Sequence, residues 1–325
     1  MKSQSWIVPA DAVGKTVAAA IKLLSGEFSW TQIKDFIRKR RIALNDVPCL
    51  DEARRVVAGD RIELREQPFP GVPSDDAVKV YHLDDDFIVV EKPAGLVSLR
   101  HVAELDWPPA RRREQSTLDE VVLRKLGALQ RLDYDLSAKV AKDRRRYIRS
   151  VHRLDRETSG LVVFARTLKA ETNLISQFAA HTIERVYLTV VPGEPTAQTL
   201  TSYFVRDRGD GIRGSTLEIA DGKHATTHIR PLEKLGKYSL VECRLETGRT
   251  HQIRIHMTEA GFPVCGDPVY RSAFGQPPVD DQSGAPRLVL HAHRLEFTHP
   301  TTGNRLRFES PLSVDLEKFV NRLRG

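Results

Sequence analysis

The chain has 325 residues, of which 40% are hydrophobic, and this is enough for one large domain and a small one. Its 50 Lys and Arg residues exceed its 43 Asp and Glu residues, and the net charge of +7 favours polyanionic partners such as nucleic acid. Three widely spaced cysteines argue against a disulfide framework, and no apolar run reaches the roughly 20 residues of a membrane span. We therefore expect a soluble, cytoplasmic protein without a signal peptide.

The first 65 residues predict a compact unit of two helices and short strands. A helix is expected over residues 17–24, and a second one after Ser29, which forms a capping-box pair with Gln32. Strands are expected over residues 42–44 and 61–65. The second helix ends in a basic run made of Arg38, Lys39, Arg40 and Arg41. This run is either a solvated helix end or a contact for RNA phosphate.

The motifs RIALN (residues 41–45) and VAGDRI (residues 57–62) make this unit resemble the S4-like RNA-binding domain, which is named after a ribosomal small-subunit protein. Residues 67–74 contain several Pro and Gly residues that disfavour regular structure, so this stretch is expected to be a linker. We therefore divide the chain near residue 70, into an RNA-binding domain over residues 1–70 and a larger domain over residues 71–325.

The larger domain is expected to contain more strands than helices. Strands are predicted over residues 87–91, 184–191, 238–245, 288–292, 295–297 and 305–308. Helices are predicted from Thr167 as N-cap through Leu174, Ile175 and Phe178, from Thr250 as N-cap to a point near Gly261, and over residues 314–323. Two stretches, 99–149 with two Arg triplets and 209–222 with several Gly residues, are expected to be irregular. Because no βαβ rhythm is present, we predict an α+β fold with a largely antiparallel sheet flanked by helices.

One carboxylate stands between two arginines in the stretch VHRLDRETSG, residues 151–160. The flanking Arg153 and Arg156 would keep Asp155 ionised, and an ionised acid can act as a nucleophile or a base. Gly160 would let a substrate approach the backbone closely. The alternative is a structural acid that caps backbone amides in a turn.

Four blocks of the larger domain resemble, in order, the signature motifs of the RluA-type RNA pseudouridine synthases. They read VVEKPAGL (residues 89–96), HRLDRETSGL (152–161), ETGRTHQIR (246–254) and LHAHRL (290–295). With the N-terminal unit, the resemblance spans nearly the whole chain. It implies an isomerase that detaches uracil from its ribose within RNA, rotates it and rejoins it through carbon instead of nitrogen.

The resemblance also implies roles for particular residues. Asp155 matches the catalytic acid, which acts either by attack on the sugar or base or by removing a proton from the sugar. Tyr187 matches the aromatic residue that would stack on the flipped uracil, and Arg249 matches the basic residue that pairs with the acid. A strand tyrosine and a surface arginine are the structural alternatives for these two residues.

The resemblance further implies that the target base is extruded from its stack, because a paired uridine cannot reach a pocket. Arg153 matches the side chain that fills the vacated stack. Lys92 and Arg254 are expected either to meet phosphate or to be ordinary exposed charges. Family members with the N-terminal unit mostly act on large-subunit ribosomal RNA (rRNA), which we favour over transfer RNA (tRNA) as the partner.

The larger domain contains five histidines that raise the question of a metal site, namely His152, His251, His256, His291 and His293. No third acidic or thiolate ligand stands near the last two, and the family uses no metal, so we expect hydrogen-bonding histidines, no metal and no cofactor. We expect a monomer. The alternative function is that of a non-catalytic RNA chaperone or ribosome-assembly factor that only binds RNA.

Overall fold

The computed structural model describes residues 3–45, 47–69, 71–129, 148–209, 211–216 and 222–325. It divides into two compact units, one of Met1–Gly71 with Gly209–Ile212 and one of Val72–Arg208 with Arg213–Gly325. The first division follows Gly71, next to the linker expected from the sequence. Residues 209–212 group with the N-terminal unit although they lie within the sequence of the larger one. This was not expected, because nothing in their composition distinguishes them from a loop of the larger unit.

The N-terminal unit packs two helices on a small antiparallel sheet. Helix α1 (Val17–Ser25) has Thr16 as N-cap, and α2 (Trp30–Arg38) begins at the expected capping box of Ser29 and Gln32. The strand order is β1-β4-β2-β3, with bounds Gln4–Ile7, Arg61–Leu64, Ile42–Leu44 and Val47–Pro48. One face of α2 is buried in the core with strand residues, through Ile33, Phe36 and Ile37.

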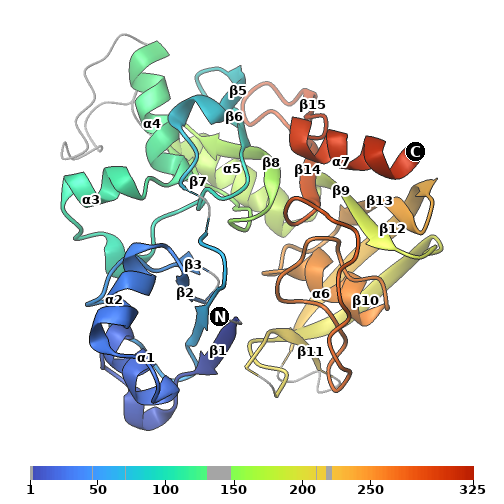
Figure 1. Ribbon diagram of the computed structural model, residues 1–325. Helices are drawn as coiled ribbons and strands as arrows, with labels where there is room; N and C mark the ends of the chain where they lie inside the picture. The colour runs from blue at the N-terminus through green and yellow to red at the C-terminus, as the bar shows by residue number, and fades with distance from the viewer. Residues whose placement is uncertain (1–2, 46, 70, 130–147, 210, 217–221) are drawn as a thin grey trace. The chain divides into compact units, whose positions relative to one another are not determined.

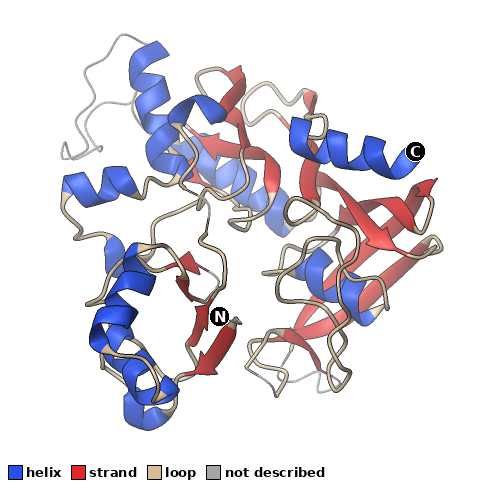
Figure 2. Ribbon diagram, viewed as in Figure 1, coloured by secondary structure: helices blue, strands red, loops and turns tan. Residues whose placement is uncertain are grey.

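The larger unit is built on one 11-stranded sheet, counted over the described residues (Figures 1 and 2). Its order is β11-β10-β12-β13-β9-β14-β8-β6-β5, with β15 added to β14 and β7 to β8. The strands are β5 (Lys79–Leu83), β6 (Phe87–Lys92), β7 (Arg149–Ser150), β8 (Ser159–Ala165), β9 (Glu184–Pro192), β10 (Gln198–Val205), β11 (Gly214–Thr216), β12 (Lys223–Leu235), β13 (Tyr238–Leu245), β14 (Leu290–Thr298) and β15 (Arg305–Glu309). Among the strands that the structure describes, only β14 and β8 pair in parallel, so the predicted largely antiparallel α+β fold is confirmed.

Helices cover both faces of this sheet. Helices α4 (Leu118–Leu129) and α6 (Gln252–Glu259) pack on one face, and α5 (Leu168–Ala179) and α7 (Val314–Arg324) pack on the other. Alternate side chains of one strand therefore enter opposite cores. In β9, Tyr187 joins the cluster that contains α4 and α6, whereas Leu188 joins the cluster that contains α7. Tyr187 and Leu188 therefore lie on opposite faces of the sheet.

The segment 99–149 is more regular than expected. It contains the short α3 (Pro109–Glu114) and the longer α4, whose buried residues Leu118, Val121, Val122 and Leu126 follow a helical spacing. Charged residues stand between these apolar positions in the sequence. The first Arg triplet, 111–113, lies on α3, where Arg112 pairs with Glu120 (2.8 Å). The second triplet, 144–146, lies outside the described residues.

Two further predictions require correction. Helix α6 does not begin after Thr250: its N-cap is His251, which has a left-handed backbone with φ 62°. The two strands expected over 288–292 and 295–297 are one strand, β14, whose register shifts between Ala292 and Arg294. Strands β1, β3, β5, β7, β10, β11 and β12 were not predicted, and β11 lies in the stretch 209–222 that was expected to be irregular. Within the predicted α5, Ile175 is exposed while Leu174 is buried.

Candidate active site

Asp155 lies in the loop between β7 and β8, and hydrogen bonds hold this loop on both sides of it. Before it, Leu154 N–H donates to Ser98 Oγ (3.2 Å), and the same hydroxyl donates to the Leu154 carbonyl (2.6 Å). After it, the Arg156 carbonyl accepts a hydrogen bond from Lys92 Nζ (2.9 Å). The Asp155 side chain is 25% exposed, so a partly open carboxylate is presented from a fixed backbone.

Gly160 joins this loop to the sheet. Its φ is 116°, and a Cβ atom there would lie 2.3 Å from the Ala292 carbonyl oxygen and 2.5 Å from the Ala292 nitrogen. Gly160 pairs with Ala292 where β8 and β14 run in parallel. The close approach that requires glycine is therefore made by the backbone of β14, and the expectation that Gly160 admits a substrate is wrong.

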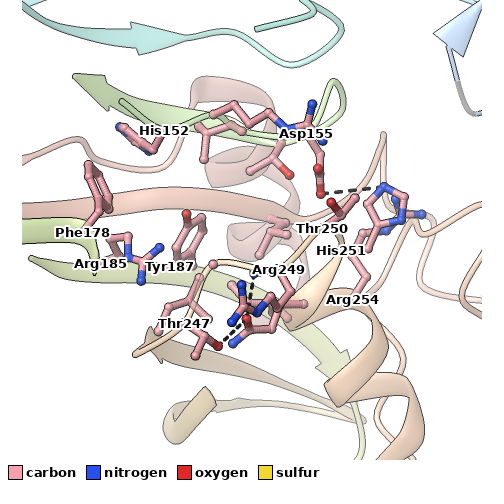
Figure 3. Close-up of a pocket in the computed structure, with 18 of the residues that line it drawn as sticks. His152, Asp155, Phe178, Arg185, Tyr187, Thr247, Arg249, Thr250, His251 and Arg254 are labelled. Atoms are coloured by element: carbon pink, nitrogen blue, oxygen red, sulfur yellow. Dashed lines mark hydrogen bonds and ion pairs between the residues drawn. The ribbon is translucent and has the colours of Figure 1, made fainter. Parts of the chain in front are cut away.

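Asp155 faces a cavity of about 510 Å³, a size typical of small-ligand sites (Figure 3). Most of its lining comes from three segments that are distant in sequence: the loop that carries Asp155, strand β9, and residues 245–254 at the end of β13 and the start of α6. The end of α5 with Phe178, the following His181, and Leu290 of β14 complete it. Five residues proposed from the sequence line it, namely Arg153, Asp155, Tyr187, Arg249 and Arg254. Lys92 does not line it.

The side chain that approaches Asp155 is a histidine and not the expected arginine. His251 Nε2 lies 4.0 Å from Asp155 Oδ2. Arg249 is exposed, its Nε donates to the His224 carbonyl (2.9 Å), and among the described contacts it makes no ion pair with Asp155. The expected pairing of Arg249 with Asp155 is therefore not formed, because the guanidinium is drawn to a backbone carbonyl of β12.

Tyr187 forms part of the cavity lining from β9. Its side chain is only 8% exposed, and burial raises the pKa of its hydroxyl to about 12, with Asp155 adding to the rise and Arg185 opposing it. The neighbouring Arg185 donates to the Glu246 carbonyl (2.7 Å) and lies over the ring of Phe178. Tyr187 therefore presents a protonated hydroxyl and an aromatic ring in the same cavity as the Asp155 carboxylate.

Two residues expected to meet phosphate are buried instead. Lys92 has no exposed surface, and its Nζ donates to the carbonyls of Pro93, Leu96 and Arg156 at 2.9 to 3.0 Å. Burial lowers the pKa of Lys92 to about 7. Arg254 is 3% exposed and makes a bidentate ion pair with Asp267, at 2.6 and 2.5 Å. The prediction that these two residues bind phosphate is therefore wrong.

The other predicted RNA contacts divide by exposure. Arg153 is exposed at the cavity and has no hydrogen-bond partner among the described residues. In the N-terminal unit, Arg38 and Lys39 are exposed, but both pair with Asp35, at 2.5 and 2.7 Å. Arg40 and Arg41 are half-buried, and Arg41 donates to the Arg65 carbonyl (2.8 Å) and lies over the Phe36 ring. Arg41 is thus a structural residue, contrary to the prediction.

All five histidines considered as metal ligands have hydrogen-bond partners. His152 Nε2 accepts the Val163 N–H (3.0 Å), and His291 Nδ1 lies 2.9 Å from the Ser159 hydroxyl. Burial lowers the pKa of His152 to about 3 and that of His291 to about 4, so both are neutral at ordinary pH. Within the described ranges, no three His, Cys, Asp or Glu side chains are grouped so as to hold a metal ion.

Residues 86–259 match the family model described as RNA pseudouridylate synthase. The chain belongs to this family. It is 34% identical over 330 residues to the ribosomal large subunit pseudouridine synthase D of Neisseria meningitidis, with 98% of this chain and 81% of that protein covered. It is 33% identical to the Xanthomonas campestris protein of the same name (98% and 92% covered) and to the uncharacterized RNA pseudouridine synthase YlyB of Bacillus subtilis (93% and 92% covered).

Solved structures agree with this assignment at the level of the fold. Human RNA pseudouridylate synthase domain containing 4 superposes with a TM-score of 0.57 at 20% identity, covering 76% of this chain and 93% of that one. The resemblance found in the sequence motifs is therefore confirmed: the chain is a pseudouridine synthase, an RNA isomerase. No helix among the described residues is long and apolar enough to cross a membrane.

Two residues of this pseudouridine synthase site were missed by the sequence reasoning. His251 was considered only as a metal ligand, although it lies within the block at residues 246–254 that carried the resemblance. Thr158 lines the cavity, and its buried hydroxyl has no partner among the described residues. Its position three residues after Asp155, in a loop that folds back on itself, was the available signal, since the Thr158 N–H donates to the Asp155 carbonyl (3.2 Å).

Proposed function

We propose that this synthase converts uridines of large-subunit rRNA to pseudouridine, with Asp155 as the catalytic carboxylate. The observation that carries the assignment of Asp155 is its partly exposed side chain, which faces the same cavity as the Tyr187 ring and is held by a rigid loop. The choice of rRNA over tRNA rests on the relatives named ribosomal large subunit pseudouridine synthase D, which align with 98% of this chain.

The remaining cavity residues support a division of roles. Tyr187 stacks on the extruded uracil and, because its pKa is raised to about 12, acts as a hydrogen-bond donor and not as a base at neutral pH. Arg153 occupies the space that the base vacates, since it is exposed and without a partner among the described residues. Arg249 binds a backbone phosphate at the mouth of the cavity through its terminal nitrogens, because only its Nε is engaged.

The N-terminal unit adds electrostatic attraction to RNA through its exposed cations, Arg38 and Lys39, as an S4-like domain would. We propose that the enzyme acts as a monomer in the cytoplasm. Its three cysteines, Cys49, Cys243 and Cys265, are buried and form no disulfide with one another, in keeping with a reducing compartment.

The test uses RNA tritiated at uracil carbon 5, because that carbon loses its proton when the base is rejoined to the sugar. Wild-type protein is expected to release tritium from rRNA, and the Asp155→Asn variant is expected to release it at least about 10³-fold more slowly. Asparagine has nearly the same size but carries no charge, so RNA binding by the variant should persist. Filter binding of the same RNA provides this control.

Equal tritium release by both proteins, or no release from total cellular RNA by the wild type, would contradict the assignment. The second of these results, together with intact RNA binding and normal ribosome assembly, would favour the non-catalytic assembly factor. Mapping pseudouridines in cells with and without the protein separates the substrates. Sites lost only from tRNA would overturn the choice of rRNA.

A further inference from the structure

Asp155 has one close side-chain neighbour with a nitrogen directed at it, which is His251 (Figure 3). The distance of 4.0 Å between His251 Nε2 and Asp155 Oδ2 is too long for a hydrogen bond but short enough for direct electrostatic interaction. Catalytic hydrogen bonds often shorten to their working length only around a bound substrate. A small rotation of the Asp155 carboxylate would close this gap.

The other ring nitrogen of His251 is hydrogen-bonded to a buried tyrosine. His251 Nδ1 lies 2.8 Å from the hydroxyl of Tyr270, and the two rings meet edge to face at 5.4 Å. Tyr270 is 2% exposed, its ring lies under the Arg254 guanidinium, and its N–H donates to Asp267 Oδ1 (2.9 Å). The buried Arg254 and Asp267 pair therefore fixes Tyr270, and Tyr270 fixes His251.

This chain of contacts selects one tautomer of the imidazole. Burial lowers the pKa of His251 to about 4 and raises the pKa of Tyr270, so the imidazole is neutral and the phenol keeps its proton. An Nε2 lone pair would repel the Asp155 carboxylate, whereas an Nε2–H attracts it. The proton therefore lies on Nε2, and Nδ1 accepts the hydrogen bond that the Tyr270 hydroxyl donates.

We propose that His251, oriented by Tyr270, is a positioning residue for Asp155: it directs an N–H donor at Oδ2 and so fixes the rotamer of the carboxylate. This inference rests on the proposed role of Asp155 as the catalytic carboxylate. The left-handed backbone of His251, φ 62°, is a conformation that histidine adopts more readily than most residues other than glycine. That backbone places the side chain beside the cavity at the start of α6.

The charges that face His251 determine how it responds to pH. Asp155 and Asp267 raise the pKa of His251, whereas Arg254 and Arg213 lower it, and burial is the largest influence. The imidazole consequently stays neutral across the working range.

The experiment measures single-turnover rates of tritium release with enzyme in excess, so that product release does not limit the rate. His251→Leu, which has no donor, is expected to react about tenfold to hundredfold more slowly while its Kd for RNA stays within about twofold of the wild-type value. His251→Gln, whose amide nitrogen reaches about as far as Nε2, is expected to recover most of the rate. Tyr270→Phe removes the hydroxyl that donates to Nδ1, and its rate is expected to be about threefold to tenfold lower.

Two controls separate positioning from damage to the fold. His181→Leu imposes the same backbone strain, because His181 also has a left-handed backbone with φ 57°. It removes an imidazole from the lining of the same cavity, but His181 makes none of the described contacts with Asp155. The difference in rate between the two leucine variants, at matched melting temperature, isolates the donor. If Tyr270 acts through His251, adding Tyr270→Phe to His251→Leu causes no further loss of rate.

A rate for His251→Leu within twofold of that for His181→Leu would overturn the inference. An additive effect of Tyr270→Phe in the His251→Leu background would also overturn it, as would failure of His251→Gln to recover the rate. Failure of the proposed function gives a different result, since the wild-type protein itself would then release no tritium from any RNA.

Discussion

At the scale of single residues, the structure separates charges that face the cavity from charges that support it from behind. Lys92 belongs to the second kind. It ties the turn after β6 to the loop that carries Asp155, because the same Nζ binds the Leu96 and Arg156 carbonyls. Arg254 lines the cavity, but it also supports the Tyr270 ring and is buried in an ion pair with Asp267. The geometry of the cavity therefore depends partly on basic side chains that are buried and bonded within the protein.

The depressed pKa of Lys92 predicts a specific dependence of stability on pH. Lysine in the unfolded chain keeps its proton up to about 10.5, whereas folded Lys92 loses it near pH 7. Between these values the unfolded state binds more protons, so the contribution of Lys92 to the free energy of unfolding increases as the pH rises from 7 to 10. Methionine has a similar length and does not titrate, so the Lys92→Met variant should lack this increase.

Urea unfolding of both proteins at pH 7, 8.5 and 10 measures the difference. Other groups that titrate in this range contribute equally to both proteins and cancel. If the difference in free energy of unfolding between the wild type and Lys92→Met is the same at all three pH values, folded Lys92 keeps its proton, held by its three carbonyl partners.

At the scale of elements, the site depends on the one parallel contact in the sheet, between β8 and β14. Gly160 makes that contact possible, since a Cβ atom there would collide with the Ala292 backbone. The Gly160→Ala variant is therefore expected to lose at least about 3 kcal/mol of stability, through the collision and the positive φ together.

Gly303→Ala provides the matched control for this prediction. Gly303 also has a positive φ, 74°, but a Cβ atom added there would meet no other atom within 4 Å, so only backbone strain of about 1 kcal/mol is expected. Thermal unfolding of the two variants measures the difference. Equal losses would mean that β8 and β14 separate easily, and that their close approach does not hold the Asp155 loop in place.

The helices and strands also show which features of the fold can be predicted from the sequence. Caps and apolar periods predicted α1, α2, α5, β6, β9 and β13, because those signals are local. The residue type of Lys92 and Arg254 does not reveal that they are buried, because burial is decided by segments distant in sequence. The same limit applies to the contact between His251 and Asp155, which requires the left-handed start of α6 to meet a loop about a hundred residues earlier.

At the scale of the whole molecule, the net charge of +7 overstates the positive charge that is available to bind RNA. Many cations are committed to internal pairs, such as Arg254 with Asp267, Arg100 with Glu120 and Arg124 with Asp75. The N-terminal basic run is partly neutralised as well, because Asp35 binds both Arg38 and Lys39. Composition therefore indicates the class of partner, while the pairing of charges determines the strength of attraction.

This neutralisation makes the proposed RNA-binding role of the N-terminal unit testable. Replacing Asp35 with Asn frees two exposed cations without removing either, so the affinity for rRNA should rise several-fold at 50 mM salt, and the slope of log K against log salt concentration should steepen by about 0.7 to 0.9 for each phosphate gained. This gain in affinity should fade at high salt as screening increases.

The matched control is Glu233→Gln, which gives the molecule the same net charge but frees Arg324 on the larger unit. If both variants raise the affinity equally, RNA responds to total charge alone and the N-terminal unit has no particular role, whereas a rise confined to Asp35→Asn assigns RNA contact to the end of α2.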